Sequence, residues 1–134
     1  MKLGYKQLKN LAIFLGVVTF TWVIFDTVKN FDKTDTLYKK ANNAFLYKKY
    51  DNSLKLYKAV YKKDNENLFA LEGIARSLSR MKKYKEAEEI FLEVINRDNT
   101  FAPAYANLGI LYDTIGQHNQ ALKYYNITIE LDTK

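Results

Sequence analysis

The side chains that could carry out chemistry in this sequence are few and dispersed. His118 is the only histidine and cysteine is absent, so zinc and iron lack the nitrogen and sulfur ligands that they need. Glu86, Glu88, Glu89 and Glu93 lie close together, but lysines at 82, 83 and 85 sit about one helical turn away. That pattern is typical of a solvated helix face with paired charges and not of a catalytic carboxylate pair. These residues predict no enzyme, no metal site and no cofactor.

The composition argues against two further classes of function. The five glycines are isolated from one another, so no glycine-rich loop is present to hold a phosphate group. The net charge of +6 would suit a nucleic-acid partner, but most of the cations are lysines. Arginine is the side chain better suited to reading phosphates and bases. We therefore expect neither nucleic acid nor a small-molecule substrate as a partner.

A period of 34 residues runs through the chain from residue 34 onward. The columns that it defines keep small residues together, large residues together and acids together, at 41/75/109, 53/87/121, 57/91/125 and 64/98/132. Tyr50, Tyr84 and His118 share another column, which predicts a packing role for His118 in place of acid–base chemistry. Self-similarity at this period predicts consecutive copies of one unit at 34–67, 68–101 and 102–134.

Each copy reads as a pair of helices joined by a short polar turn, at 48–49, 82–83 and 116–117. Small residues allow two helices to approach closely, and the large residues at 57/91/125 would fill the wedge between one copy and the next. Pro103 fits the first turn of a helix, where its missing N–H has no intrahelical partner to lose. A single pair cannot bury its apolar stripe, so the copies must stack. The sequence therefore predicts an all-α solenoid.

These columns resemble the tetratricopeptide-repeat (TPR) family over residues 34–134. The last copy carries the resemblance most plainly, through Tyr105, Leu108, Gly109, Tyr112, Ala121, Tyr125 and Asp132. The closing proline of the family pattern is replaced by Asn65, Asn99 and Thr133. The resemblance implies a right-handed solenoid of three helical hairpins that binds other proteins.

In this family the first helices of successive repeats line a concave groove that receives peptides. By repeat position, the resemblance places these residues in it: Tyr38, Asn42, Phe45, Leu46, Phe69, Arg76, Arg80 and Ile110, with Asp35, Glu72, Ser79, Ala106, Asp113 and Thr114 beside them. Such a surface suits an apolar or mildly acidic segment of a partner. Packing between repeats accounts for the same residues equally well. The family's clamp for chaperone tails is matched here only by Asn42, so binding of a chaperone tail is not expected.

The first thirty residues precede the repeats. Residues 1–10 form a basic tail, and residues 11–25 contain no charge. Extended to residue 28, this run reaches the ~30 Å of a bilayer core when the flanking lysines extend outward. We predict a transmembrane anchor helix at 11–28 that contacts the lipid bilayer, followed by a linker at 29–33. A cleaved signal peptide would need small residues after the apolar run, and a buried core helix would need a polar face, but both alternatives stay open.

Charge favours one orientation of this anchor. The basic tail has no acid, whereas Asp26, Asp32 and Asp35 accompany the lysines that follow the anchor. This asymmetry favours a cytoplasmic N-terminus with the repeats outside the cytoplasm, and repeats that face the cytosol are the alternative.

The last repeat has no polar capping helix after it in this sequence, so we expect Tyr124 and Ile127 to belong to an exposed apolar end. An anchor, a repeat array and the expected lack of catalytic residues together predict a membrane-anchored scaffold or assembly subunit of a membrane protein complex. The alternative is a receptor or chaperone-like protein that binds transient peptide segments.

Overall fold

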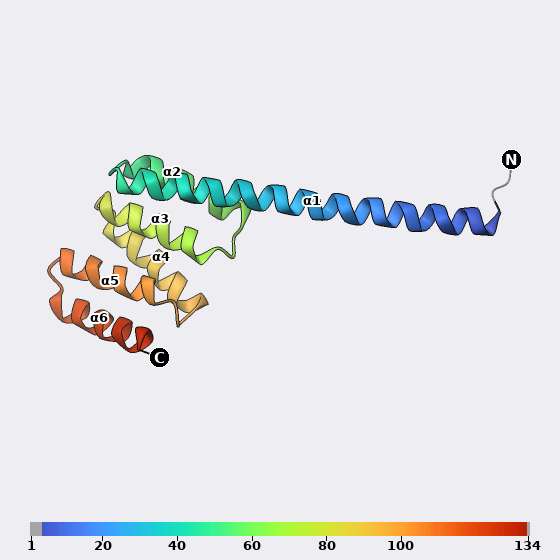
Figure 1. Cartoon of the computed structure of the whole chain (residues 1–134). Helices are drawn as coiled ribbons and strands as arrows, with labels where there is room; N and C mark the ends of the chain where they lie inside the picture. Colours follow the sequence, from blue (N-terminus) through green and yellow to red (C-terminus); the bar gives the residue numbers. More distant parts are fainter. Residues whose placement is uncertain (1–3, 134) are drawn as a thin grey trace. The chain divides into compact units, whose positions relative to one another are not determined.

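The computed structural model describes residues 4–133, apart from the side chains of residues 30–32; residues 1–3 of the predicted basic tail and Lys134 lie outside the described residues. Its elements are α1 (Tyr5–Leu46), α2 (Tyr50–Lys63), α3 (Leu68–Arg80), α4 (Tyr84–Arg97), α5 (Ala102–Thr114) and α6 (His118–Asp132). Every regular element in this range is a helix, which confirms the predicted all-α class (Figure 1).

The chain forms two compact units, Met1–Thr36 and Leu37–Lys134. Helix α1 contributes to both, and it runs through residues 29–33, for which the sequence predicts a linker. The predicted linker is therefore helical. The residues that follow Thr36 on α1 form the first helix of the first repeat.

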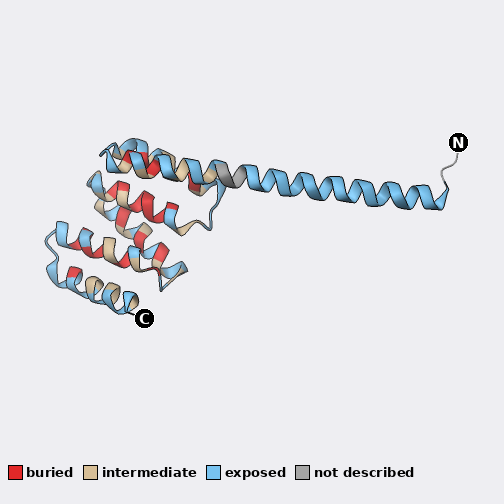
Figure 2. Cartoon of the chain, in the orientation of Figure 1, coloured by how far each residue is buried: buried red, intermediate tan, exposed pale blue. Residues whose placement is uncertain are grey.

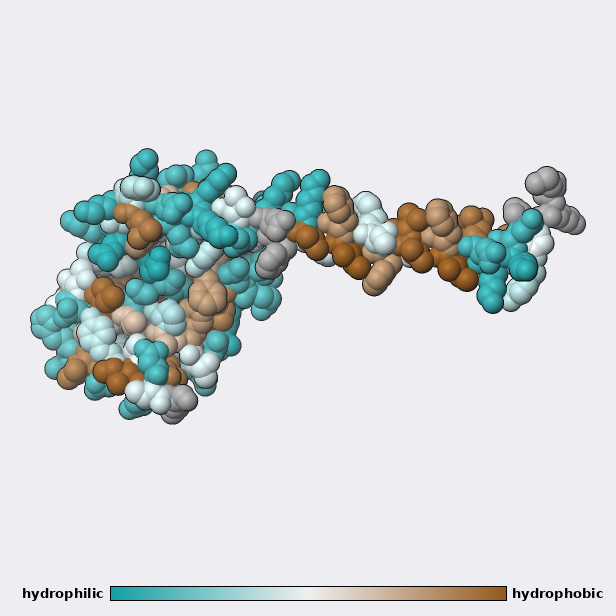
Figure 3. Space-filling model, viewed as in Figure 1, coloured by the Kyte–Doolittle hydropathy of each residue, from teal (hydrophilic) through white to brown (hydrophobic). Residues whose placement is uncertain are grey.

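The first unit is an apolar helix whose described side chains are mostly exposed (Figures 2 and 3). The hydroxyls of Thr19, Thr21 and Thr27 each donate to a backbone carbonyl three or four residues earlier, at 2.8–3.0 Å. The polar atoms of these three side chains are thus satisfied within the helix, as an apolar environment requires. By length and composition, α1 is the helix among residues 4–133 that could cross a membrane.

In the second unit, the wedge column packs as the period predicts. Tyr57 and Phe91 have no exposed surface, and they lie where α2 meets α3 and where α4 meets α5. Gly73 makes room for Tyr57, because a Cβ atom at this glycine would lie 2.5 Å from the Tyr57 ring. Gly109 makes the same kind of room for Tyr125. Aromatic size in one column and missing side chains opposite it therefore set the helix spacing.

The small-residue columns are also buried. Ala41, Ala75 and Ala87 have no exposed surface, and the buried faces of α3, α4 and α5 turn toward their neighbours (Figure 2). The hydroxyls of Ser53 and Ser77 lie 2.8 Å apart and share a hydrogen bond where α2 and α3 pack together. Each buried hydroxyl thereby gains a partner, which removes most of the cost of burying it.

The turns inside the repeats share one backbone feature. Lys48, Lys82 and Gly116 stand 34 residues apart, and each has a positive φ, of 59°, 63° and 81° respectively. Glycine adopts this left-handed conformation readily, whereas a side chain such as that of lysine is strained in it. The predicted turns are therefore confirmed, and two of them carry a lysine where glycine would be the relaxed choice.

The predicted apolar end needs a correction. Tyr124 is half-buried, because its ring stacks on that of Tyr112 with centroids 5.4 Å apart and also contacts Tyr105. Ile127 is half-buried as well. The apolar side chains of α6 that are clearly exposed are Leu122 and Ile129.

His118 does not pack between helices as its column predicted. Its side chain is exposed, and Nδ1 lies 2.8 Å from the Asp113 carboxylate. The two tyrosines of the same column, Tyr50 and Tyr84, are half-buried. An imidazole is shorter and more polar than a phenol, and a carboxylate within reach holds it at the surface.

Candidate functional site

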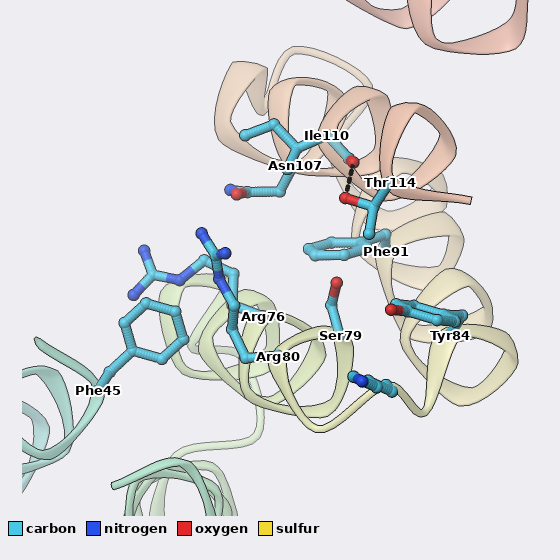
Figure 4. A pocket seen from close by; sticks show the side chains of 10 residues that line it. Phe45, Arg76, Ser79, Arg80, Tyr84, Phe91, Asn107, Ile110 and Thr114 are labelled. Atoms are coloured by element: carbon cyan, nitrogen blue, oxygen red, sulfur yellow. Dashed lines mark hydrogen bonds between the residues drawn. The ribbon is translucent and has the colours of Figure 1, made fainter. Parts of the chain in front are cut away.

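One hollow on the surface of the repeats, which we call the groove, has a volume of about 230 Å3. It is bounded by residues of α1, α3, α4 and α5 and of the turn between α3 and α4 (Figure 4). Its lining consists of Phe45, Arg76, Ser79, Arg80, Lys82, Tyr84, Phe91, Asn107, Ile110 and Thr114. Residues from all three predicted repeats thus meet in one place.

Half of the predicted partner residues line this groove. Phe45, Arg76, Arg80 and Ile110 come from three different helices, and the structure brings them together. Repeat position alone could predict this, because the same turns of successive first helices face the same side of a solenoid.

The other half do not line it. Tyr38 packs its ring edge-on against Tyr57, and Asn42 accepts a hydrogen bond from the Tyr57 hydroxyl. Phe69 packs against Phe101, with ring centroids 5.0 Å apart. Leu46 is exposed close to the end of α1. For Tyr38 and Asn42, the alternative of packing within the repeats describes the contacts better.

Four lining residues were not predicted for the groove: Lys82, Tyr84, Phe91 and Asn107. The period assigned Tyr84 and Phe91 to packing columns. Phe91 both packs in the core and lines the groove, since it has no exposed surface yet borders the hollow. Lys82 reaches the groove from a turn, which a rule based on the first helices does not consider. The positive φ of Lys82 could not be read from its residue type.

Arg76 is the most connected side chain of the groove. Its guanidinium lies over the Phe45 ring, 4.4 Å from the centroid, which is a cation–π arrangement. Its Nη2 donates to the Tyr57 hydroxyl at 3.3 Å, and its Nε lies 3.5 Å from Glu72 Oε1. These contacts hold the arginine in one position between α1, α2 and α3.

Glu72 is a buried carboxyl group directly beside the groove. Only 4% of the residue is exposed, and Asn107 Nδ2 donates to its Oε1 at 2.7 Å. Burial raises the pKa of Glu72 to about 7, although the charge of Arg76 opposes this rise. Burial also raises the pKa of Tyr57 to about 12. Near neutral pH, Glu72 therefore exists in both protonation states.

Arg80 and Lys82 differ from Arg76, because both are exposed. Among the residues that the structure describes, neither makes an ion pair or a side-chain hydrogen bond. The groove lining contains three cations and no carboxylate. Two of these cations are therefore free to meet an anionic group.

The groove offers little for catalysis. Residues 4–133 contain no group of three or more His, Asp or Glu side chains that could hold a metal ion. The hollow is open and its polar groups are mainly cations and hydroxyls, so the arrangement fits binding by charge and apolar contact.

Comparison with known proteins identifies the fold. The chain matches the tetratricopeptide-repeat family over residues 44–109 and again over residues 102–134. A solved structure of the second TPR of Spaghetti (RPAP3), bound to the HSP90 peptide SRMEEVD, is 22% identical with a TM-score of 0.64, and the match covers 73% of this chain and 91% of that one. The type III secretion translocator chaperone SycD of Yersinia enterocolitica is 19% identical with a TM-score of 0.70, covering 77% and 78%.

A third example is the Sgt2 TPR domain from Aspergillus fumigatus, which is 22% identical with a TM-score of 0.69 over 76% of this chain and 68% of that one. Identities at this level establish the fold. The helices of this chain form a tetratricopeptide-repeat solenoid, and a protein of this class is a module for protein–protein interaction.

Proposed function

We propose that this chain is a membrane-anchored TPR module that holds a segment of a partner protein in the groove, as a scaffold or assembly subunit of a membrane protein complex. The observation that carries the proposal is the groove itself. It combines an aromatic ring, an exposed aliphatic side chain and two free cations, from three helices and a turn, in one open hollow. Aromatic rings and arginines are among the side chains that carry most of the binding energy at interfaces.

Neighbours of known structure support a binding role for such a surface. The RPAP3 domain is seen with a bound peptide, and SycD is described as a translocator chaperone. By analogy, a chaperone-like binder of transient peptides is the second candidate. The two roles differ in stoichiometry: a permanent subunit should purify with its partner in a fixed ratio, whereas a transient receptor should lose its partner on washing.

The anchor part of the proposal is supported by the long, exposed apolar surface at 11–28. The threonines on this surface satisfy their hydroxyls internally, so insertion into lipid leaves none of those three groups without a hydrogen bond. We place the N-terminus in the cytoplasm and the repeats outside it, on the charge asymmetry of the flanks.

A matched pair of substitutions tests the groove. Ile110 lines it with 43% of its surface exposed, and Leu92 lies on α4 outside the groove with 41% exposed. Ile110→Asn and Leu92→Asn therefore remove similar apolar surface at similar cost to folding. Full-length protein carrying each change is purified from membranes in mild detergent, and the co-purified partner is quantified by mass spectrometry.

We expect Ile110→Asn to reduce the recovered partner about tenfold, because apolar contacts at the centre of an interface carry much of its energy. Leu92→Asn should retain it. Equal recovery with both variants would mean that the partner does not use the groove. Loss with Leu122→Asn instead would locate the contact on the exposed face of α6.

A further inference from the structure

The charges around the groove are unbalanced. Arg80 and Lys82 are exposed cations without a described ion pair or side-chain hydrogen bond, and the lining offers no acid to neutralise them. Elsewhere in the repeats, two exposed cations do lie beside acids: Lys83 pairs with Glu86 at 3.6 Å, and Arg97 pairs with Glu93. Two unpaired like charges at one hollow are favourable only for a ligand that brings negative charge.

The third cation, Arg76, already has a carboxylate neighbour. Glu72 lies 3.5 Å from its Nε on the same helix, and Asn107 of α5 fixes this carboxyl group by donating to it. The other titratable group near this pair is Tyr57 of α2, whose hydroxyl accepts from Arg76 and donates to Asn42 of α1. The attraction of Arg76 for an outside anion is therefore reduced whenever Glu72 is ionised.

Resting on the proposed function of the groove, we propose that its occupant is an acidic segment of the partner protein, bound through Arg80 and Lys82 beside the apolar side chains of Phe45 and Ile110, and that Glu72 competes with this segment for Arg76. The site of charge contact is the C-terminal end of α3 and the turn after it. Asn107 and the Phe45 ring keep Glu72 and Arg76 in place, so that an acid of the partner meets a preformed pair.

Two synthetic peptides serve as probes. One is a short fluorescein-labelled peptide of Asp, Glu and Leu, and the other replaces each acid with Asn or Gln. Binding to the full-length protein in detergent micelles is measured by fluorescence anisotropy at low and at physiological salt. The acidic peptide should bind more tightly than its neutral counterpart, and its advantage should shrink as salt increases.

The chain supplies a matched control for each cation. Arg80 ends α3 and Lys63 ends α2, both exposed, so Arg80→Gln and Lys63→Gln remove one charge from equivalent positions. Lys82 and Lys48 occupy the same turn position with φ of 63° and 59°, so Lys82→Gly and Lys48→Gly relieve the same backbone strain. Only Arg80 and Lys82 of these four line the groove.

We expect Arg80→Gln and Lys82→Gly each to weaken the acidic peptide about three- to fivefold, the size of a partly exposed ion pair, while leaving the neutral peptide unchanged. Lys63→Gln and Lys48→Gly should bind both peptides as the wild type does. Equal affinity for the two peptides, no binding of the acidic peptide, or equal effects of groove and control variants would each overturn the proposal.

Glu72 has a separate readout in the pH dependence of binding. The pKa of Glu72 is raised to about 7 by burial, so acidification from pH 8 to pH 6 protonates it and releases Arg76, while the acids of the peptide stay ionised. Wild-type affinity for the acidic peptide should rise about threefold across this range. Glu72→Gln should bind tightly at both values of pH. A variant that keeps the wild-type pH dependence would refute the role of Glu72.

These outcomes separate the two levels of the proposal. If Ile110→Asn abolishes partner recovery but the charge variants behave like their controls, the groove is the binding site and only its preference for acids is wrong. If Ile110→Asn has no effect, the proposed function itself fails.

Discussion

Gly73→Ala should destabilise the repeats more than the equivalent change at Gly109, and the structure indicates by how much. An added methyl at residue 73 would lie 2.5 Å from Cε1 and 2.7 Å from Cδ1 of Tyr57. Tyr57 cannot move aside readily, because it is fully buried and its hydroxyl is bonded to both Asn42 and Arg76. An added methyl at Gly109 would meet Tyr125 at 2.6 Å, but that ring is only half-buried and can turn toward solvent.

The two substitutions share one favourable term and differ in one unfavourable term. Replacing glycine by alanine inside a helix gains about 1 kcal/mol in either position. Overpacking a fixed core costs typically about 1–3 kcal/mol, which applies in full at Gly73 and only in part at Gly109. We therefore expect Gly73→Ala to be destabilised by up to about 2 kcal/mol, and Gly109→Ala to be close to wild type.

Thermal unfolding followed by circular dichroism measures the difference. For a domain of this size, about 1 kcal/mol shifts the midpoint by about 4–8 °C, so the two variants should be clearly resolved. Full-length protein in detergent micelles serves for all three forms. A Gly73→Ala midpoint equal to or above that of Gly109→Ala would refute the argument that the buried Tyr57 ring sets the spacing of α2 and α3.

Four further predictions use simple assays. Ala87→Leu, at a fully buried helix contact, should cost about 1–3 kcal/mol in urea unfolding, and an unchanged midpoint would mean that the repeat register is wrong. The folded chain holds the Glu72 proton up to about pH 7, whereas the unfolded chain releases it near pH 4.5. Stability should therefore fall by about 3 kcal/mol as pH rises from 4.5 through 7. Glu72→Gln should lack this loss of stability. A variant whose stability falls with pH as much as that of the wild type would contradict the prediction. The full-length protein should stay with membranes after alkaline carbonate washing, while a form that begins at Thr34 should be released from them. Extraction of the full-length form by carbonate would contradict the predicted membrane anchor. Protease added outside intact cells should digest the repeats, and their protection would reverse the proposed orientation.

The period of the sequence predicted the parts of the fold that depend on residue size. Ala41, Ser53 and Ala87 are buried, Tyr57 and Phe91 fill the wedges between helix pairs, and Pro103 lies in the first turn of α5. Size and repeat position suffice here, because close helix contacts exclude large side chains whatever the rest of the sequence does.

Features that depend on individual partners could not be predicted in this way. His118 is exposed and does not pack like the tyrosines of its column, because its ring contacts Asp113. Tyr124 is half-buried because its ring stacks on that of Tyr112. Repeat position placed Glu72 among the groove residues, but the hydrogen bond that its carboxyl group accepts comes from Asn107 of the next repeat. Such pairs are specific to this chain.

The groove likewise contains residues that repeat position predicts and residues that it does not. Positions on the first helices predicted Phe45, Arg76, Arg80 and Ile110 in the groove. They did not predict Lys82, because Lys82 reaches the groove from a turn. Its place in the groove depends on a left-handed backbone conformation that lysine rarely adopts.

Site-specific photocrosslinking tests the central claim most directly, because it reports contact without disturbing the groove. A photoreactive amino acid is placed at Thr114, which is exposed and lines the groove, or at Glu89, which is exposed on α4 outside it. After irradiation of intact membranes, we predict that a partner crosslinks from residue 114 and not from residue 89, and that an excess of the acidic peptide suppresses this product. A partner that crosslinks from residue 89 as strongly as from residue 114 would contradict the assignment of the groove as the binding site.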